Sequence, residues 1–478
     1  MIQSVNHLAL LPLYLAAGTA VLVLITDLAT GRRAPVIGAA VAGGLATAVA
    51  APPAASADAT FCTGSACSWV PSPLAASMAV LFALLTLGVL GLSTPVLRLG
   101  AAPAGEFCFL LACAMTGGVV IGYAGDLITL IVGLETLTLP LYVLVGLRRF
   151  APGAPVTTAG SAAAVTFLLV SIVSTAIALV GAALLFAATG ALHLTALTGT
   201  AAAPDLAPLA TVGVSLIVIG FAFKVAAVPL HAWAPPTYDG APLPIAAYLS
   251  TASKLGGVLA LALVVPRLDT GPLLAVLAVL TMTVGNLVAL RQTRMVRLLA
   301  WSSVAQAGYI LAPLAAGAAG VAAAAAYAVL FIVLEFTAFA AVVALRPPSA
   351  DGGQIAEYRG VARRSPWLAA ALVLAFAGLA GLPPGLAGLF AKVTIIDALI
   401  DTGWGWLAGV VALNAVIALA YYLRAAAILY TGPPGIAVAD LRMPKLPVSR
   451  PVAATIGVAA AIAIGLGFAP QLLFDALT

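Results

Sequence analysis

Charged side chains are scarce in this sequence. Asp, Glu, Lys and Arg together make up 7% of the 478 residues, whereas hydrophobic residues make up 63%. A water-soluble domain cannot bury so large an apolar fraction, so the composition excludes that class and predicts a polytopic membrane protein. The apolar runs are about 20 residues long, the length of a membrane-spanning helix, whereas the strands of a membrane β-barrel are about ten residues long and alternate in polarity. An all-α membrane protein is therefore predicted.

Cysteine is also rare, with four residues in the chain. Cys108 and Cys113 lie inside an apolar run, where inert packing is the predicted role. Cys62 and Cys67 share a short loop, FCTGSAC, and could form a disulfide if that loop faces an oxidising compartment. The sequence contains no GxGxxG, P-loop, haem-attachment or iron–sulfur spacing. We therefore expect no cofactor, metal or redox chemistry on this chain.

Hydropathy divides the chain into fourteen predicted membrane spans. They lie near residues 7–29, 36–52, 74–92, 106–124, 127–147, 161–188, 209–234, 241–265, 273–290, 299–317, 318–345, 367–398, 404–430 and 451–474. The twelfth is longer than a crossing requires and contains the sequence GLPPG at 381–385, so we expect two half-helices around an unwound middle. The seventh contains Pro229, which removes a backbone donor and should break that helix. Broken helices at corresponding places in two halves are typical of transporters built from inverted repeats.

The charges of the loops predict the orientation of the chain. Of the 20 basic residues, 16 fall in one set of alternating loops, only Arg267 falls in the opposite set, and three lie within spans. The majority set consists of Arg32, Arg33, Arg98, Arg148, Arg149, Arg291, Arg294, Arg297, Arg346, Arg359, Arg363, Arg364, Arg424, Arg442, Lys445 and Arg450. By the positive-inside rule this set marks the cytoplasmic side, so both termini are predicted to lie outside.

Lysines are distributed differently from arginines. Three of the four lysines, Lys224, Lys254 and Lys392, lie inside predicted spans. An ammonium group at membrane depth costs about 3 kcal/mol or more unless it is hydrated, paired or neutralised. Arginine keeps its proton, whereas a desolvated lysine can release its proton near neutral pH. The arginines are therefore interpreted as anchors in the loops, and the three lysines as carriers of protons or ions.

Glu135 lies in the middle of the fifth predicted span, and an acid embedded at this depth is a functional candidate by default. We interpret Glu135 and Lys224 as an ion pair that tunes the lysine. The alternative is a purely structural bridge between two helices, because desolvation offsets much of the attraction in a buried pair. His231 follows the proline of the broken seventh span, where it either relays protons or caps the half-helix.

Two further acids are harder to interpret. Glu335 lies within an apolar run. It is either a functional acid of the second half of the chain or a residue that contacts a neighbouring subunit. Asp397 follows Lys392 by five residues. On a regular helix that spacing places the two about 140° apart, so they are poorly placed to pair, and Asp397 is predicted to face an outer exit.

Four stretches of the chain carry long and specific motifs. They read GDLITLIVGLETLTLPLYVLVGL, FKVAAVPLHAWAPPTYDGAPLP with YLSTASK, RLLAWSSVAQAGYI, and LAGLPPGLAGLFAK. Together, over about residues 106–430, they resemble the antiporter-like membrane subunits of bacterial NADH-quinone oxidoreductase, respiratory complex I, most closely the N type. The resemblance implies fourteen helices with two inverted five-helix repeats, and a subunit without a redox centre in the bacterial inner membrane. It also implies proton movement driven by sister subunits that carry NADH, FMN, iron–sulfur clusters and quinone, with M-type and K/J-type subunits as neighbours.

The same resemblance implies roles for individual residues. It assigns proton translocation to Glu135, Lys224, Lys254 and Lys392. Lys392 matches a lysine found in the N and L types, and the lateral arm of the L type is not expected here because the chain ends after its fourteenth span. Gln306 departs from the family, which often has histidine; glutamine cannot titrate, so a relay between Lys254 and Lys392 would use water. Glu335 and Asp397 match no family position.

The predicted organisation has four segments. Residues 1–105 hold the first three helices, 106–265 the first antiporter-like repeat, 266–430 the second repeat, and 431–478 the fourteenth helix. Two other classes of protein share this architecture: subunits of multi-subunit cation/proton antiporters and subunits of membrane-bound hydrogenase-type complexes. The identity of the neighbouring subunits would separate these alternatives.

Overall fold

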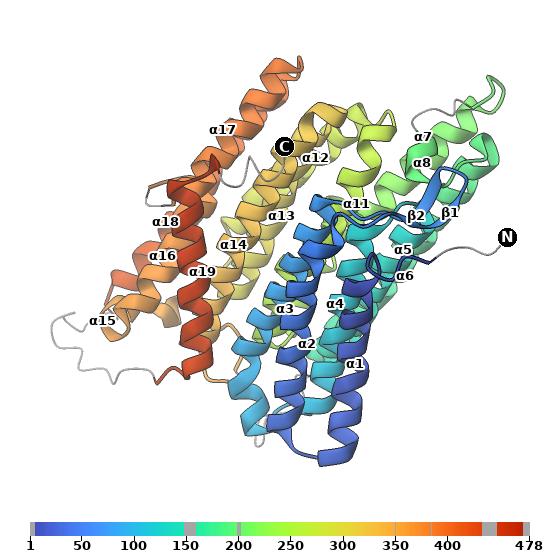
Figure 1. The fold of residues 1–478 in the computed structure, drawn as a ribbon. Coiled ribbons are helices and arrows are strands. Elements are labelled where there is room, and N and C mark those ends of the chain that lie inside the picture. The colour runs from blue at the N-terminus through green and yellow to red at the C-terminus, as the bar shows by residue number, and fades with distance from the viewer. Residues whose placement is uncertain are drawn as a thin grey trace. The chain divides into compact units, whose positions relative to one another are not determined.

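The computed structural model describes residues 5–147, 159–197, 202–348, 350–383, 385–432 and 447–471. Some residues singled out above lie outside this described part of the chain, namely Arg148, Arg149, Pro384, Arg442 and Lys445. The structure is almost entirely helical (Figure 1). The chain divides into two compact units. Unit 1 comprises residues 1–90, 96–225 and 252–270, and unit 2 comprises residues 91–95, 226–251 and 271–478.

Unit 1 is a bundle of long apolar helices. Its elements are α1 (Leu11–Thr30), α2 (Arg33–Ala54), β1 (Thr60–Thr63), β2 (Ala66–Trp69), nearly all of α3 (Pro73–Leu99), α4 (Ala104–Tyr123), α5 (Leu127–Gly146), α6 (Ala159–Thr189), α7 (Leu194–Leu197), α8 (Ala207–Lys224), α11 (Lys254–Val264) and the short 3-10 helix η3 (Val265–Arg267). Glycines allow close helix approach: a Cβ at Gly117 of α4 would lie 2.1 Å from the backbone nitrogen of Leu137 in α5. Such small-residue contacts are how helices pack in lipid, where no hydrophobic force drives them together.

A disulfide-linked hairpin packs against the end of helix α4 in unit 1. Strands β1 and β2 pair antiparallel, and Cys62 and Cys67 face each other across the pair and form a disulfide. Trp69 at the end of β2 stacks on Tyr123 of α4 with ring centroids 4.7 Å apart. The sequence left this disulfide open, and the structure contains it; the hairpin itself was not predicted.

Unit 2 contains the second half of the chain and one segment from the middle. Its elements are α9 (Ala234–Gly240), α10 (Leu243–Tyr248), α12 (Gly271–Ala289), α13 (Met295–Leu314), η4 (Gly317–Gly320), α14 (Val321–Leu345), η5 (Ile355–Tyr358), α15 (Val361–Arg364), α16 (Pro366–Ala380), α17 (Leu386–Asp401), α18 (Gly405–Tyr430) and α19 (Arg450–Phe468). Helices α12 and α13 run side by side (Figure 1). A π-helix, η2 (Leu249–Ser253), joins α10 of unit 2 to α11 of unit 1.

The expected all-α membrane fold is confirmed. Twelve helices among the described residues are long and apolar enough to cross a membrane, and α16 is a shorter apolar helix. Each of the fourteen predicted spans corresponds to an observed helix or to a pair of shorter helices. The predicted division into inverted repeats stays a prediction.

The two predicted breaks are present, with one difference in position. The twelfth span consists of α16 and α17. Helix α16 ends at Ala380 and is capped by Gly381, whose φ of +84° suits glycine. The seventh span breaks earlier than Pro229, because α8 already ends at Lys224 and α9 begins at Ala234. The break starts before the proline because Ala226 has a left-handed backbone conformation, with a φ of +60°, which a right-handed helix does not accommodate.

Candidate functional site

The side chain of Lys224 lies in a polar cluster inside unit 1. Its Nζ donates to Glu135 Oε1 at 2.6 Å, to Ser171 Oγ at 2.9 Å and to Thr138 Oγ1 at 3.3 Å. The hydroxyl of Thr175 donates to the same carboxylate oxygen of Glu135. The lysine side chain is 4% exposed and the glutamate 20% exposed. The predicted pairing of these two residues is therefore present, and the ammonium group has three oxygen acceptors.

Helix periodicity explains how this cluster forms. Glu135 and Thr138 are three residues apart on α5, and Ser171 and Thr175 are four residues apart on α6, so each pair lies on one helix face. The hydroxyls of Thr138, Ser171 and Thr175 were not singled out from the sequence. Their spacing opposite an embedded acid and lysine is the signal that would have found them.

Lys254 lies at the start of α11, directly after the π-helix, and is 1% exposed. A π-helix inside a transmembrane span leaves the regular hydrogen-bonding pattern and is frequent at functional sites. The sequence did not predict this irregularity. The hydroxyls of Ser250 and Thr251 both donate to the carbonyl of Ala247, in the turn before them.

Lys392 of α17 is held at the break of the twelfth span, inside unit 2. Its Nζ donates to the carbonyl oxygens of Leu379 at 2.9 Å and Ala380 at 2.7 Å, and lies 5.4 Å from the ring centroid of Tyr309. The last carbonyls of a helix have no partner within that helix and carry partial negative charge, so the end of α16 suits a cation. The break therefore provides a buried binding place for the ammonium group of Lys392, a residue that is 5% exposed.

A network of amides and tyrosines surrounds this lysine. Gln306 of α13 donates to the Leu379 carbonyl at 3.2 Å and to the Tyr422 hydroxyl at 3.1 Å, and accepts from Tyr327. Tyr422 also shares a hydrogen bond with Ser302. Gln306 and Lys392 thus bind the same carbonyl oxygen. The residue that departs from the family's histidine occupies a fully satisfied polar position in unit 2.

The remaining candidates occupy different environments. Glu335 of α14 is completely buried. His231 is half-buried and its ring centroid lies 5.2 Å from that of Trp301. Asp397 is on the exposed face of α17, and no described ion pair joins it to Lys392.

An ion-pair network at the loops of unit 2 was not predicted. Arg294 binds both carboxylate oxygens of Asp239, at 2.9 and 3.0 Å, and reaches Asp351 at 2.8 Å. Arg346 binds Glu357 at 2.6 Å. Hydrogen bonding to Asp239 raises the pKa of Arg294 above its usual value. The network ties the end of α9 to the loop before α13, and fixes one end of the segment that follows the broken seventh span.

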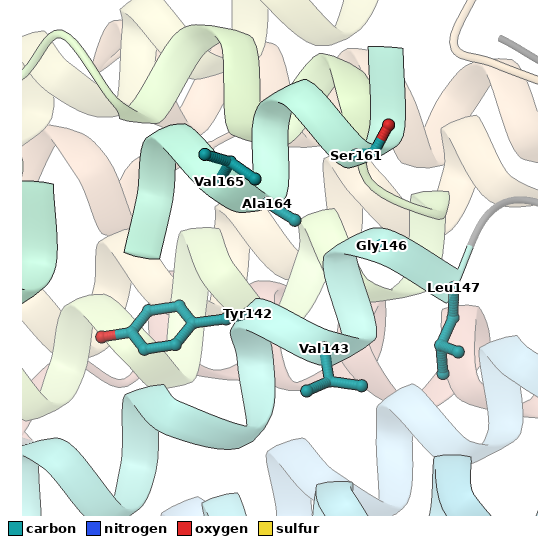
Figure 2. A pocket seen from close by; sticks show the side chains of 7 residues that line it. All are labelled: Tyr142, Val143, Gly146, Leu147, Ser161, Ala164 and Val165. Atoms are coloured by element: carbon teal, nitrogen blue, oxygen red, sulfur yellow. The ribbon is translucent and has the colours of Figure 1, made fainter. Parts of the chain in front are cut away.

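A pocket opens between α5 and α6 of unit 1. Figure 2 shows the seven residues that line it: Tyr142, Val143, Gly146, Leu147, Ser161, Ala164 and Val165. Its lining is apolar apart from the hydroxyls of Tyr142 and Ser161, so it offers no set of catalytic groups. Among the described residues, no three His, Cys, Asp or Glu side chains gather as the ligands of a metal would.

Comparisons with known proteins agree with the motifs. The family described as "NADH:quinone oxidoreductase/Mrp antiporter, TM" matches residues 124–418. NADH-quinone oxidoreductase subunit N of Salinispora tropica is 58% identical over 99% of this chain and 99% of its own length. Subunit N 2 of Streptomyces griseus is 44% identical over 91% of this chain and 84% of its own.

The chain belongs to this family. The resemblance to the N type of antiporter-like subunit, inferred from four motifs, is confirmed by the N subunits among its relatives. Among solved structures, a chain of respiratory complex I from Thermus thermophilus superposes with a TM-score of 0.81 at 27% identity, over 98% of this chain and 99% of that one. A chain of the Mrp complex from a Dietzia species has a TM-score of 0.81 at 22% identity, over 99% of this chain and 96% of that one, a likeness of fold alone. As a member of this family, the chain is a multi-pass membrane protein.

Proposed function

We propose that this chain is the proton-translocating N-type membrane subunit of an NADH-quinone oxidoreductase, and that its buried lysines carry the protons. The observation that carries the proposal is the Lys224–Glu135 pair, which lies among hydroxyls inside a bundle otherwise built of apolar helices. Ionisable groups are costly at membrane depth, and paired ones mark ion and proton pathways. The 58% identical subunit N supports the assignment to this enzyme complex.

In this proposal each residue has a separate role. Lys224 holds a proton while Glu135 balances its charge, and releases it when the charge of the carboxylate is screened. Lys254, at the π-helix, is the next carrier. Lys392 is the outward terminus, because the carbonyls at the break of α16 stabilise its charged form without fixing a counter-ion. His231 is the candidate relay beside the broken seventh span.

We further propose that the chain carries no redox centre of its own and that electrons pass through partner subunits with FMN, iron–sulfur clusters and quinone. The neighbours would be M-type and K/J-type membrane subunits, in the inner membrane of a bacterium. The loop charges support an orientation with both termini outside. The repeat boundaries at residues 106, 266 and 431 belong to the same proposal.

An antiporter subunit is the competing function. The Mrp chain shares the fold at 22% identity, a level that supports no statement about activity. The higher identity to curated N subunits over nearly the whole chain favours the oxidoreductase. A cation gradient that drives proton exchange without NADH oxidation would favour the antiporter instead.

The decisive experiment uses the assembled complex in sealed vesicles. NADH oxidation by a short-chain quinone and proton uptake are recorded together for the native complex and for Lys224→Met and Lys392→Met variants. We expect both variants to assemble and to take up fewer protons per NADH oxidised, because a carrier is missing from the path. Unchanged proton uptake in both variants would remove these lysines from the pathway.

A further inference from the structure

Two asparagines are buried between α12 and α18 of unit 2, outside the four sequence motifs and the proposed proton path. Asn286 of α12 is completely buried, and Asn414 of α18 is 2% exposed. Asn286 Nδ2 donates to Asn414 Oδ1 at 3.1 Å and to the Asn414 carbonyl oxygen at 3.2 Å. Asn414 Nδ2 donates to Thr283 Oγ1 at 3.3 Å. Hydrogen bonds of this kind commonly join membrane helices, so cohesion between α12 and α18 is the simplest role of the pair.

The amide of Asn286 also binds two tyrosines, which suggests more than cohesion. Its Nδ2 donates to the Tyr309 hydroxyl at 3.1 Å, and its Oδ1 accepts from the Tyr421 hydroxyl at 3.0 Å. Both tyrosines are completely buried. Both the nitrogen and the oxygen of this amide therefore have partners on neighbouring helices, and these partners fix the orientation of the amide.

Tyr309 connects this amide to Lys392. The Nζ of Lys392 lies over the Tyr309 ring, 5.4 Å from its centroid. A cation within about 6 Å of the centroid is attracted to the face of an aromatic ring, and the attraction is stronger when water is excluded. Lys392 is 5% exposed and Tyr309 is completely buried, so water is largely excluded here. The ring therefore contributes to holding the ammonium group.

The orientation of the Tyr309 ring decides the sign of this contribution. The face of an aromatic ring carries partial negative charge and its edge partial positive charge, so a ring turned edge-on would repel the ammonium group. The ring extends from α13, packs against Tyr327 of α14 with centroids 5.9 Å apart, and ends at the hydrogen bond from Asn286. Asn286 thus holds the end of the side chain that is farthest from the backbone.

We propose that Asn286 is a positioning residue for the proton site at Lys392, because its amide keeps the face of the Tyr309 ring toward the ammonium group. The hydrogen bond between Asn286 and Tyr309 does not involve the lysine, so it persists when Lys392 releases its proton. The ring is then already in place when the next proton arrives, and no reorganisation is needed. This inference rests on the proposed role of Lys392 as a proton carrier.

An aromatic face suits a carrier in a way that a carboxylate does not. In unit 1 the carboxylate of Glu135 lies 2.6 Å from Lys224 Nζ, and a carboxylate is a base that can take the proton itself. The face of the Tyr309 ring attracts the ammonium group of Lys392 but offers no site for a proton. The group that stabilises the charge in unit 2 therefore does not compete for the proton.

The experiment records proton uptake and NADH oxidation by the assembled complex in sealed vesicles. We expect Tyr309→Leu to slow proton uptake by about tenfold or more, because it removes an aromatic face from a desolvated cation. Asn286→Leu and Tyr309→Phe keep a ring but lose the bond that holds it, so each should slow uptake by about threefold. Thr283→Val is the matched control, because Thr283 belongs to the same network on α12 but accepts from Asn414. It should match the native complex.

A double variant separates positioning from cohesion. Asn286→Leu and Tyr309→Phe remove the same hydrogen bond, so the two together should be no slower than either one alone. Effects that multiply, or equal slowing in Asn286→Leu and Thr283→Val, would leave Asn286 as a link between helices and overturn the inference. Native proton uptake in Asn286→Leu would overturn it as well. If Asn286→Leu fails to assemble, the rate and the spectrum of Tyr309→Phe decide.

Infrared spectroscopy provides a readout that a merely structural asparagine would not affect. The difference spectrum between the resting and the NADH-driven complex should contain a tyrosine ring band, because the ring senses the charge of Lys392. This band should disappear in Tyr309→Phe and in Lys392→Met, and it should shift in Asn286→Leu. A tyrosine band that persists unchanged in Tyr309→Phe overturns the inference. Native proton uptake in Lys392→Met overturns the proposed function itself.

Discussion

Gly257 of α11 packs directly against Lys224 of α8. A Cβ at position 257 would lie 2.8 Å from the Cβ of Lys224 and 3.0 Å from its carbonyl carbon. Real Cβ atoms do not approach so closely, so only glycine leaves room for the lysine backbone at this point. The placement of the Lys224 ammonium among its three acceptors therefore depends on an absent methyl group on a neighbouring helix.

A single methyl group should show this dependence. In Gly257→Ala, α8 must move by several tenths of an ångström, which displaces Lys224 from Glu135 and costs about 1–3 kcal/mol of stability. We expect slower proton uptake in sealed vesicles and a lower melting temperature of the complex. Gly18→Ala is the control, because nothing lies within 4 Å of its Cβ position and alanine favours a helix over glycine. Equal proton uptake in both variants would contradict the packing argument.

The fit of Lys224 to its acceptors predicts how its substitutes behave. Lys224→Arg keeps the charge but cannot release its proton, so coupled uptake should fall while the complex still assembles. Lys224→Met leaves Glu135 without its cation, and breaking a buried pair in this way costs about 3–5 kcal/mol. Proton uptake and thermal melting, measured on both variants, separate these effects. Full activity in Lys224→Arg would leave only a fixed positive charge at this site.

Two charged residues of α17 should differ in effect because they face different surroundings. Lys392 is buried against the carbonyls of Leu379 and Ala380, whereas Asp397 is exposed on the other side of the helix. We expect Lys392→Met to lower proton uptake strongly and Asp397→Asn to lower it much less. If both variants assemble and Asp397→Asn is the more damaging, the carboxylate is the terminal proton site.

The cysteines of the disulfide allow the predicted orientation in the membrane to be tested. The loop charges predict that Cys62 and Cys67 lie on the outer face. After reduction, a membrane-impermeant thiol reagent added to intact cells should label both cysteines. Cys108, buried in α4, is the internal control and should stay unlabelled. Protection in cells combined with labelling in inside-out vesicles would reverse the orientation.

A pH effect is expected at the loop network of unit 2. The backbone N–H of Gln354 and the guanidinium of Arg346 bind Glu357 and lower the pKa of that carboxyl. A lowered pKa stabilises the loop above the unfolded value of about 4.3, and this contribution is lost as pH falls through the folded value. Amide exchange at η5, corrected for its intrinsic pH dependence, should accelerate below about pH 4. Glu357→Gln should remove that acceleration, and an unchanged profile would exclude the carboxyl as its source.

The membrane fold could be predicted because apolar runs of helix length and the positions of arginines are read directly from the sequence. The Glu135–Lys224 pair could also be predicted, because two opposite charges inside a membrane have few other partners with which to pair. The hydroxyls of Ser171 and Thr175, which bind Lys224 and Glu135, were not predicted, because serine and threonine are common in membrane helices and serve there as general hydrogen-bonding residues.

Local irregularities were harder to predict. Pro229 indicates that a helix is interrupted, but the α8 terminus at Lys224 depends on the left-handed conformation of Ala226, which no residue preference indicates. The π-helix at Leu249–Ser253 has no sequence signal, since its residues suit an ordinary helix. The carbonyls that bind Lys392 could not be predicted either, because which backbone acceptors are free depends on the conformation of the chain at the break of the twelfth span.

The interleaving of the two units affects how the protein is made. Lys224 is synthesised before residues 226–251, which belong to unit 2, and Lys254 follows them. Unit 1 is therefore complete only once residue 270 has been translated. Residues 226–251 of unit 2 are translated before that point, and well before the helices of unit 2 that follow residue 270. No single cut in the polypeptide yields one whole unit, so co-expressed fragments would have to exchange segments to rebuild either of them.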